Sequence, residues 1–242
     1  TLFRSPLTNQ HPEEEVNQLF SRVARKYDLM NNVISLGTQR AWRRVFFTQL
    51  DVAGGADCLD LCCGTGDLTI ELAKRAGRTG RVIGLDFNQA MLDLAEKKVR
   101  DLDLQKDIEL VQADAMHLPF ADNSFDVVTI GFGLRNVPDA NQVLAEVTRV
   151  LKPGGVFGCL EMSQPNNPLV RVGWKGYFKL FPLMAKAFGG NYRDYRYLQQ
   201  TSQAFVSAEK LKQMMEEAGM SSVTVTKLNF GAGAIHIGQK KR

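Results

Sequence analysis

The chain has 242 residues, of which 23% are charged and 44% hydrophobic, which is ordinary for one large α/β domain with a full core. Its net charge of +4 is too small to indicate nucleic-acid binding, although it is compatible with contact to an anionic membrane surface. No apolar run approaches the ~20 residues needed to span a bilayer, and no secretory signal opens the chain.

The four cysteines have no zinc-type spacing, and three of them fall in or beside predicted strands. We therefore expect buried free thiols, no metal site and a cytoplasmic protein, with the inner face of the cell membrane as an alternative location. The cysteines are Cys58, Cys62, Cys63 and Cys159.

The first 50 residues are expected to form an arm and a helical lid. Residues 1–12 are polar and contain two prolines, which indicates a flexible arm. From Glu13 on, apolar residues up to Tyr27 fall on one helical face. Turn-forming residues at 27–32 are expected to break this helix, and a second helix is predicted over 39–50. Since residues 13–50 precede the first strand, we interpret them as an N-terminal lid on a main domain of residues 51–242.

Short apolar runs and amphipathic segments alternate from residue 58 onward. Strands are predicted at 58–61, 81–85, 108–111, 125–130 and 156–160. Helices are predicted at 67–76, after the caps Asn88 and Asp139, and at 208–218, with a stop at 152–155. Two closely spaced strands follow at 223–228 and 234–238. The pattern predicts a Rossmann-like α/β fold, in which helices cover both faces of a seven-stranded, mostly parallel sheet with an antiparallel C-terminal strand.

An aromatic and basic insert at 164–206 interrupts this alternation. Such a mixture suits a helix at a membrane interface or over a lipid-filled groove, but an amphipathic helix packed on the domain or in a homodimer interface has the same pattern. The insert's apolar residues are Trp174, Tyr177, Phe178, Phe181, Leu183 and Met184, and its basic residues are Arg171, Lys175, Lys179 and Lys186.

The candidate ligand residues all lie just beyond strand ends, where open α/β sheets bind ligands. Asp60, Gly64, Thr65 and Gly66 follow the first strand, Asp86 ends the second, and Asp114 and Ala115 follow the third. A glycine turn with an acid about 20 residues later indicates an adenosine compound, because such an acid accepts hydrogen bonds from ribose hydroxyls.

Two adenosine ligands compete for this pattern. A dinucleotide site needs a third glycine, but Thr69 occupies that position, and Asp67 suits a pyrophosphate poorly. The sulfonium of S-adenosylmethionine tolerates Asp60 and Asp67 better, so we favour this methyl donor.

Two further stretches give the chain a family resemblance. They are Tyr27-Asp28-Leu29-Met30-Asn31 through Ser35 to Trp42, and Arg149-Val150-Leu151-Lys152-Pro153-Gly154-Gly155 through Glu161-Met162-Ser163. With the segment Gly131 to Pro138, they resemble the menaquinone and ubiquinone biosynthesis C-methyltransferases, which belong to the class I S-adenosylmethionine-dependent enzymes. The similarity runs from about residue 13 to the end of the chain. Gln39 departs from the family's histidine, and we assign it no role.

The resemblance implies methyl transfer to a ring carbon of a prenylated naphthoquinol, demethylmenaquinol, as the last step of menaquinone biosynthesis. It places donor contacts at Thr65, Asp86, Asp114 and Ala115. Arg135 and Asn136, which follow the fourth strand, are candidates for contact with the quinol oxygen, and Tyr27 for a hydroxyl from the lid. A surface ion pair for Arg135 and a packing role for Tyr27 are the plainer alternatives. His117 is interpreted as structural, and His236 as only a remote candidate.

Three alternative functions share the same cofactor residues. The first is a methyltransferase that acts on another lipid-like acceptor: the benzoquinol of ubiquinone biosynthesis, a sterol or a phospholipid. A chain with no activity of its own would be an S-adenosylmethionine-binding scaffold in a quinone-synthesis assembly. Nucleic-acid methylation is disfavoured, because the segment after the fourth strand lacks the expected proline motif and no dense basic stripe is present.

Overall fold

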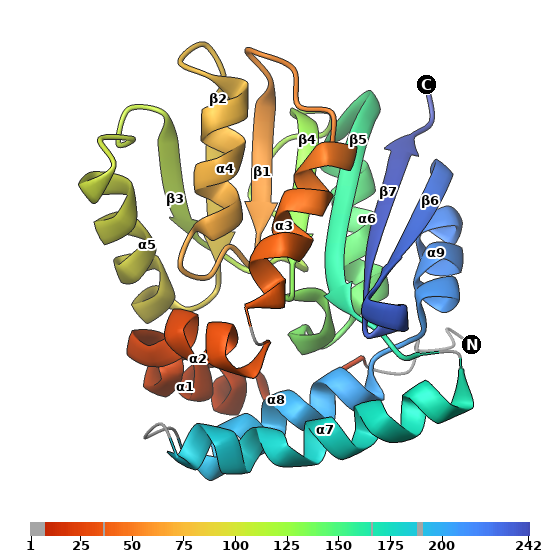
Figure 1. Cartoon of the computed structure of the whole chain (residues 1–242). Coiled ribbons are helices and arrows are strands. Elements are labelled where there is room, and N and C mark those ends of the chain that lie inside the picture. The colour runs from red at the N-terminus through yellow and green to blue at the C-terminus, as the bar shows by residue number, and fades with distance from the viewer. Residues whose placement is uncertain (1–7, 36, 166, 188–190) are drawn as a thin grey trace.

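A computed structural model describes residues 8–35, 37–165, 167–187 and 191–242, without the side chains of residues 30, 33, 34, 178 and 180–187. Its centre is one seven-stranded sheet in the order β3-β2-β1-β4-β5-β7-β6 (Figure 1). The strands are β1 Asp57–Leu61, β2 Arg81–Asp86, β3 Ile108–Gln112, β4 Phe125–Gly131, β5 Leu151–Met162, β6 Met220–Leu228 and β7 Gly233–Lys240. The predicted fold class is confirmed.

The sheet is parallel from β3 to β5, and β7 runs antiparallel to both of its neighbours. The predicted C-terminal hairpin therefore enters the sheet with β7 beside β5. The predicted stop at 152–155 is confirmed, since α6 ends at Val150, but one strand boundary was wrong: β5 begins at Leu151, opposite Phe125, rather than at residue 156. The ladder is irregular between Phe125 and Val127, which accommodates the two glycines of this segment within the strand.

Helices cover both faces of the sheet (Figure 1). On one face, α3 Thr38–Gln49, α4 Asp67–Ala76 and α5 Gln89–Asp101 bury side chains such as Phe46, Leu72 and Val99. On the other, α6 Ala140–Val150 and α9 Ala208–Glu217 contribute Val143, Val147 and Leu211 to a second core. The predicted caps are present: the side chain of Asn88 accepts from Met91 N at the start of α5, and Asp139 caps α6.

Five further helical segments lie across the carboxyl ends of the parallel strands (Figure 1). They are α1 Glu13–Val23, the 3₁₀ turn η1 Ala24–Lys26, α2 Tyr27–Ile34, α7 Pro168–Ala187 and α8 Tyr192–Ala204. The expected break at 27–32 was wrong, because these residues form α2. Asp28 lies in the first turn of α2, where the helix dipole favours a carboxylate. None of the helices in the described part of the chain is long and apolar enough to cross a membrane.

The end of the expected flexible arm makes specific contacts. Thr8 N donates to Pro138 O, and the Asn9 side chain is buried. Asn9 Nδ2 donates to Asn136 O and to the hydroxyl of Tyr197 at 2.9 and 2.8 Å. Thr8 and Asn9, which precede the lid, therefore connect it to the loop after β4 and to α8. Residues 1–7 lie outside the described residues. The division into arm, lid and main domain stays a prediction.

Candidate active site

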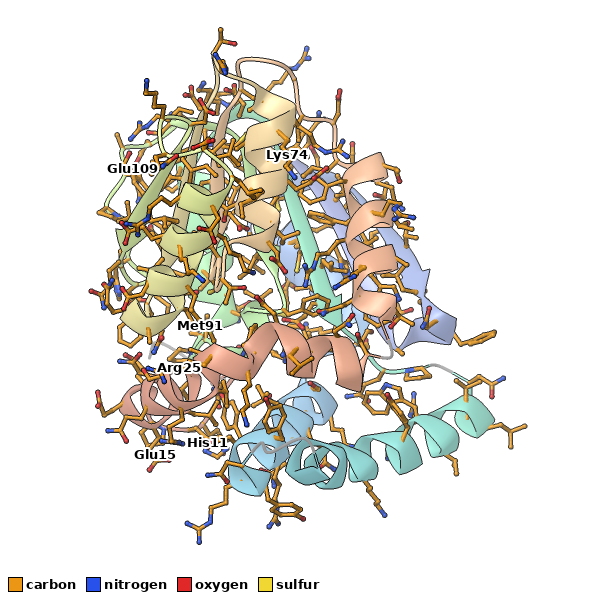
Figure 2. All side chains as sticks on the ribbon, turned by 60° about the vertical axis from the view of Figure 1, so that its left-hand side comes forward. His11, Glu15, Arg25, Lys74, Met91 and Glu109 are labelled. Carbon is orange, nitrogen blue, oxygen red and sulfur yellow. The ribbon has the colours of Figure 1, made fainter. Side chains whose placement is uncertain are left out.

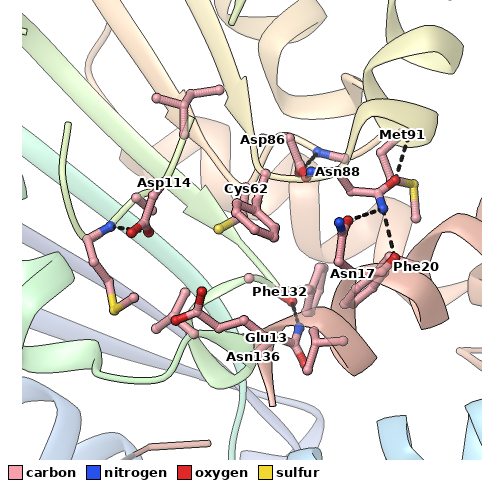
Figure 3. Close-up of a pocket in the computed structure, with 18 of the residues that line it drawn as sticks. Glu13, Asn17, Phe20, Cys62, Asp86, Asn88, Met91, Asp114, Phe132 and Asn136 are labelled. Carbon is pink, nitrogen blue, oxygen red and sulfur yellow. Dashed lines mark hydrogen bonds between the residues drawn. The ribbon is translucent and has the colours of Figure 1, made fainter. Parts of the chain in front are cut away.

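A cavity lies where β1 and β2 end, beneath the lid (Figure 3). The glycine turn forms one wall. Gly64 and Gly66 have φ angles of 55° and 83°, which a glycine adopts without steric cost. A Cβ on Gly64 would have no protein atom within 4 Å, whereas one on Gly66 would lie 3.2 Å from Ala95 Cβ of α5. Gly64 therefore leaves ligand space open, and Gly66 permits close packing of α5.

Asp86 lies in the wall of this cavity at the end of β2. Its two oxygens accept backbone hydrogen bonds from Gly64 N and Asn88 N, each at 2.8 Å. Burial raises the pKa of its carboxyl, while these N–H groups oppose the rise. Each carboxylate oxygen has a further lone pair for a ligand hydroxyl.

Asp114 and Ala115 line the far side of the same cavity (Figure 3). The Asp114 carboxylate accepts from Met116 N at 2.8 Å and contacts the exposed ring of His117 at 2.9 Å. His117 thus contacts Asp114 from outside the cavity, in keeping with the structural interpretation.

The described residues that line this cavity include no lysine or arginine, but three acids, Glu13, Asp86 and Asp114. A dinucleotide pyrophosphate needs positive or N–H-rich surroundings, so this lining fits it poorly. It fits a nucleoside with a positive sulfonium, as S-adenosylmethionine has.

Asp60 is buried at the end of β1 and accepts from the hydroxyls of Thr69 and Thr129 at 2.7 and 2.8 Å. Burial raises the pKa of Asp60 to about 7, although both hydroxyl contacts lower it. Thr69 stands where a dinucleotide site has its third glycine, and here its hydroxyl donates a hydrogen bond to Asp60 of β1.

Asp67 and Thr65 are both engaged in contacts with other elements of the chain. Burial raises the pKa of the Asp67 carboxyl, but Arg43 and Lys98 overcome this effect and hold it below its ordinary value. The Thr65 hydroxyl donates to Asp28 Oδ1 at 2.7 Å and accepts from Lys98 Nζ at 2.9 Å. These contacts connect the glycine turn to α2, α3 and α5, and they were missed because their partners are more than twenty residues apart in sequence.

A second cavity lies between the lid and the two helices of the insert. Trp42, Phe132 and Trp174 give it aromatic walls, and Arg135 is its one charged lining residue among those described. A smaller third cavity reaches from Asp60 and Gly64 to Gln39 and Arg43. Tyr27 and Phe132 line all three cavities. The donor side and the aromatic cavity therefore meet at these two side chains.

Arg135 forms a buried ion pair rather than a surface one. Its Nη1 lies 2.7 Å from Glu161 Oε1 and also donates to Phe132 O, while its buried Nε has no partner in the described part of the chain. Glu161 stands at the end of β5, where a strand-end acid was visible in sequence, but its partner was not. Asn136 Nδ2 donates to Phe132 O at 3.2 Å, and Asn136 lines the first cavity (Figure 3). Both side chains thus donate to Phe132 O, Arg135 from the aromatic cavity and Asn136 from the first cavity.

Phe132 adopts a φ of 57°, which is unusual for a bulky side chain. Hydrogen bonds to its carbonyl from Arg135 and Asn136, and from its own N–H to Leu160 O, hold it there. Its ring lies 6.3 Å from that of Trp42. Sequence gave no signal for this residue, because backbone strain depends on the loop's tertiary contacts.

Tyr27 is the first residue of α2 and so belongs to the lid. Burial raises the pKa of its hydroxyl, although the charge of Arg135 lowers it, so the group is protonated at neutral pH. The lid itself is held by Asn88, whose Nδ2 contacts Asn17 of α1 (Figure 3). The same Nδ2 also contacts Ser21 Oγ of α1. Figure 2 shows Met91 of α5 just above Arg25, with His11 lower in the same view.

His236 does not approach these cavities. Its buried ring contacts Ala208 O at 2.8 Å, and burial lowers its pKa, so it is a neutral packing group between β7 and α9. All four cysteines are free, and burial raises their thiol pKa values, which excludes a ready thiolate nucleophile.

Comparison with known proteins shows which family the chain belongs to. Residues 8–240 match the model of the ubiE/COQ5 methyltransferase family. The chain belongs to this family. A demethylmenaquinone methyltransferase of Lactobacillus johnsonii is 62% identical over 100% of this chain and 99% of that protein. One of Lactiplantibacillus plantarum is 50% identical over 93% and 96%, respectively.

Solved structures similar to this family member show the fold alone. A possible histamine N-methyltransferase of Thermotoga maritima has a TM-score of 0.66 and 20% identity over 93% of this chain and 99% of that one. The [4+2]-cyclase SpnF has a TM-score of 0.65 and 19% identity over 98% and 99%. Since enzymes with such different reactions share this fold, the fold does not choose the reaction.

Proposed function

We propose that this chain transfers a methyl group from S-adenosylmethionine to a ring carbon of demethylmenaquinol, giving menaquinol. One observation carries the proposal: a cavity with three acids in its wall and an aromatic cavity meet at Tyr27 and Phe132. A direct transfer needs the two reactants in line and about 3 Å apart, and two cavities that adjoin at shared side chains support such a transfer. The names of its relatives in the family indicate the quinol.

The donor supplies an electrophilic methyl group on a sulfonium. In this proposal Asp86 binds the ribose hydroxyls, and the segment of Asp114 and Ala115 binds the adenine edge. The glycine turn, from Asp60 through Gly64 and Thr65 to Gly66, lines the space beyond the ribose. The acid-rich, cation-free wall then favours the positive donor over its neutral demethylated product.

The acceptor ring carbon becomes nucleophilic as its neighbouring hydroxyl gives up a proton to solvent. The bond of this carbon to the methyl carbon forms as the S–CH3 bond of the donor breaks and S-adenosylhomocysteine leaves. The proton on that ring carbon then passes to the oxygen through solvent, which restores the quinol.

Arg135 lines the aromatic cavity, and in this proposal its buried Nε–H, which has no partner among the described residues, donates to the quinol oxygen. Tyr27, as a protonated hydroxyl, donates to the same region. Asn136 holds Phe132 between the two reactants. The aromatic walls exclude water from the transferred methyl group.

A turnover assay with labelled donor tests the function. We expect labelled menaquinone from the reduced naphthoquinol and none from the oxidised quinone, because the oxidised ring is electron-poor. Transfer to a benzoquinol, a sterol or a phospholipid in its place would contradict the acceptor assignment. Donor binding without transfer to any of them would favour a scaffold.

The role of Arg135 is tested in the double variant R135Q/E161Q, because neutralising Arg135 alone would leave Glu161 buried and unpaired. We expect turnover to fall about 100-fold or more while donor affinity by calorimetry stays within about twofold. The matched control R81Q/E109Q removes an exposed ion pair and should keep normal turnover. Wild-type turnover in R135Q/E161Q would refute the role.

We further propose that the outer face of α7 contacts an anionic membrane at the cytoplasmic side. Trp174 and Tyr177 face the aromatic cavity, whereas Leu169 and Val172 are 83% and 71% exposed on the other side of the helix, near Lys175 and Lys179. Phe230, 85% exposed, precedes Gly231, whose added Cβ would lie 3.3 Å from Pro165, just before α7. The expected side-chain contributions of Phe178, Phe181, Leu183, Met184 and Lys186 lie outside the described residues.

Vesicle flotation tests this contact. The triple variant L169S/V172S/F230S should lose binding to phosphatidylglycerol vesicles that the wild type retains, while L102S, which changes an exposed leucine at the end of α5, should bind normally. Equal binding by the triple variant would refute the membrane contact. A wild-type homodimer that the triple variant converts to monomer would instead assign this face to self-association.

A further inference from the structure

The small cavity at the glycine turn must receive whatever part of the donor lies beyond its ribose. It shares Cys62 and Gly64 with the nucleoside cavity, and Asn31 and Gln39 with the aromatic cavity. The end of S-adenosylmethionine beyond the sulfonium is an amino acid, with a carboxylate and an ammonium group. A site for this end therefore needs both a cation and an acid.

Arg43 is the one basic residue among the described residues that line this small cavity. It extends from α3 toward the first turn of α4, where its Nη1 pairs with Asp67 and its Nη2 donates to Gln39 Oε1 at 3.0 Å. A guanidinium carries five N–H donors in a plane, so these two contacts leave others for a ligand carboxylate. The nearby N-terminus of α4 adds a favourable positive potential.

The surrounding charges hold Arg43 in position and leave some of its N–H donors for a ligand. Lys98 Nζ lies 2.8 Å from Asp67 and 2.6 Å from Asp28, so two acids and two bases form a balanced group across α2, α3, α4 and α5. Because Lys98 shares Asp67, Arg43 is not the only cation that neutralises this acid. Asp60, across the same cavity, has no ion-pair partner among the described residues and suits the ammonium group.

We propose that Arg43 binds the α-carboxylate of S-adenosylmethionine and thereby selects donors that carry an intact amino-acid end. This inference rests on the donor assigned under the proposed function, but not on the acceptor. Since Arg43 also contacts Asp67, and Asp67 joins Lys98 and Asp28 of α2, carboxylate binding acts on the same group of charges that holds the lid against the glycine turn.

The test compares two ligands that differ only in the carboxylate. Isothermal titration calorimetry measures the affinity of wild type, R43A and R44A for S-adenosylmethionine and for its decarboxylated form. One charge-assisted contact should make the wild type prefer the intact donor by about 10-fold to 100-fold. R43A should weaken intact-donor binding by that factor, leave decarboxylated-donor binding within about twofold, and so lose the preference. R44A changes an exposed neighbour and should behave as wild type.

Equal weakening of both ligands in R43A would overturn the proposal, as would a preference that persists. If R43A unfolds, R43K serves instead: it keeps a charge near Asp67 but loses the planar pair of donors, and it should show a reduced preference. A wild type that binds neither ligand would refute the donor assignment itself. A wild type that binds both equally would refute only the role of Arg43.

Discussion

The buried carboxyl of Asp60 should make the stability of the ligand-free protein depend on pH, and Asp60→Asn should remove this dependence. In the folded chain the pKa of Asp60 is about 7, compared with an ordinary value of 3.8. Between these values the folded state keeps a proton that the unfolded state has lost. Stability contributed by the protonated group is therefore complete below pH 3.8 and falls as the pH rises toward 7.

The size of the effect follows from the same two values. The rise in the pKa of Asp60 from 3.8 to about 7 lowers the free energy of unfolding by about 4 kcal/mol at pH 8, compared with its value at low pH. About 3 kcal/mol of this loss develops between pH 5 and pH 8. An asparagine keeps the shape of the side chain and hydrogen bonds to Thr69 and Thr129, since one of the two hydroxyls can reverse its role.

Urea denaturation at pH 5, 6, 7 and 8 measures this effect as a difference between two proteins, so other titrating groups cancel. We expect the variant to gain about 3 kcal/mol relative to wild type across this range. The exposed Asp51→Asn serves as a control with a constant difference. A difference between Asp60→Asn and wild type that does not change with pH would refute the reasoning.

Three more predictions concern the lid and the glycines of the site. Asn88→Ala removes the cap of α5 and the hydrogen bonds to α1. The free energy of unfolding should therefore fall by about 1–3 kcal/mol, and limited proteolysis should cut α1 faster. Unchanged cleavage would contradict this role. Gly133→Ala brings a Cβ to 2.4 Å from Cys62 Cβ and should lower the melting temperature, whereas Gly54→Ala, with no atom within 4 Å, should not; equal melting temperatures would argue against the predicted clash. Gly64→Ala should cost only about 1 kcal/mol of stability yet weaken donor binding by calorimetry, because its Cβ enters open space rather than protein; normal binding would place the donor elsewhere.

The sheet and its edge were predictable because they depend on local sequence. Apolar runs bounded by glycine or polar caps gave the strands, and Asn88 and Asp139 marked the helix starts. The strand-end acids Asp86 and Asp114 then fell at one edge by topology alone, and the structure brings both into the same cavity. The donor roles of these residues stay predictions.

Contacts between distant segments were not predictable in this way. Arg135 and Glu161 are 26 positions apart, and only the β4–β5 pairing brings them together. The helix at 27–34 was missed because Asp28 and Asn31 are turn formers in isolation, yet here Asp28 is held by Thr65 and Lys98. Residue propensity is a weak guide where a tertiary contact of this kind decides the conformation.

Both kinds of cavity take described lining residues from the first 138 positions, but only the aromatic cavity also draws on the C-terminal part of the chain. The described residues that line the nucleoside cavity and the small cavity end at Pro138, whereas the aromatic cavity takes seven of its lining residues from Met162 onward. Mutations after residue 160 can therefore reshape the acceptor side while leaving the donor lining intact. A family built on this plan can diversify its acceptors by exchanging C-terminal segments, provided that Tyr27 and Phe132 stay at the junction. Chimeras with other members, joined in β5 close to residue 160, are the natural way to move acceptor range between them.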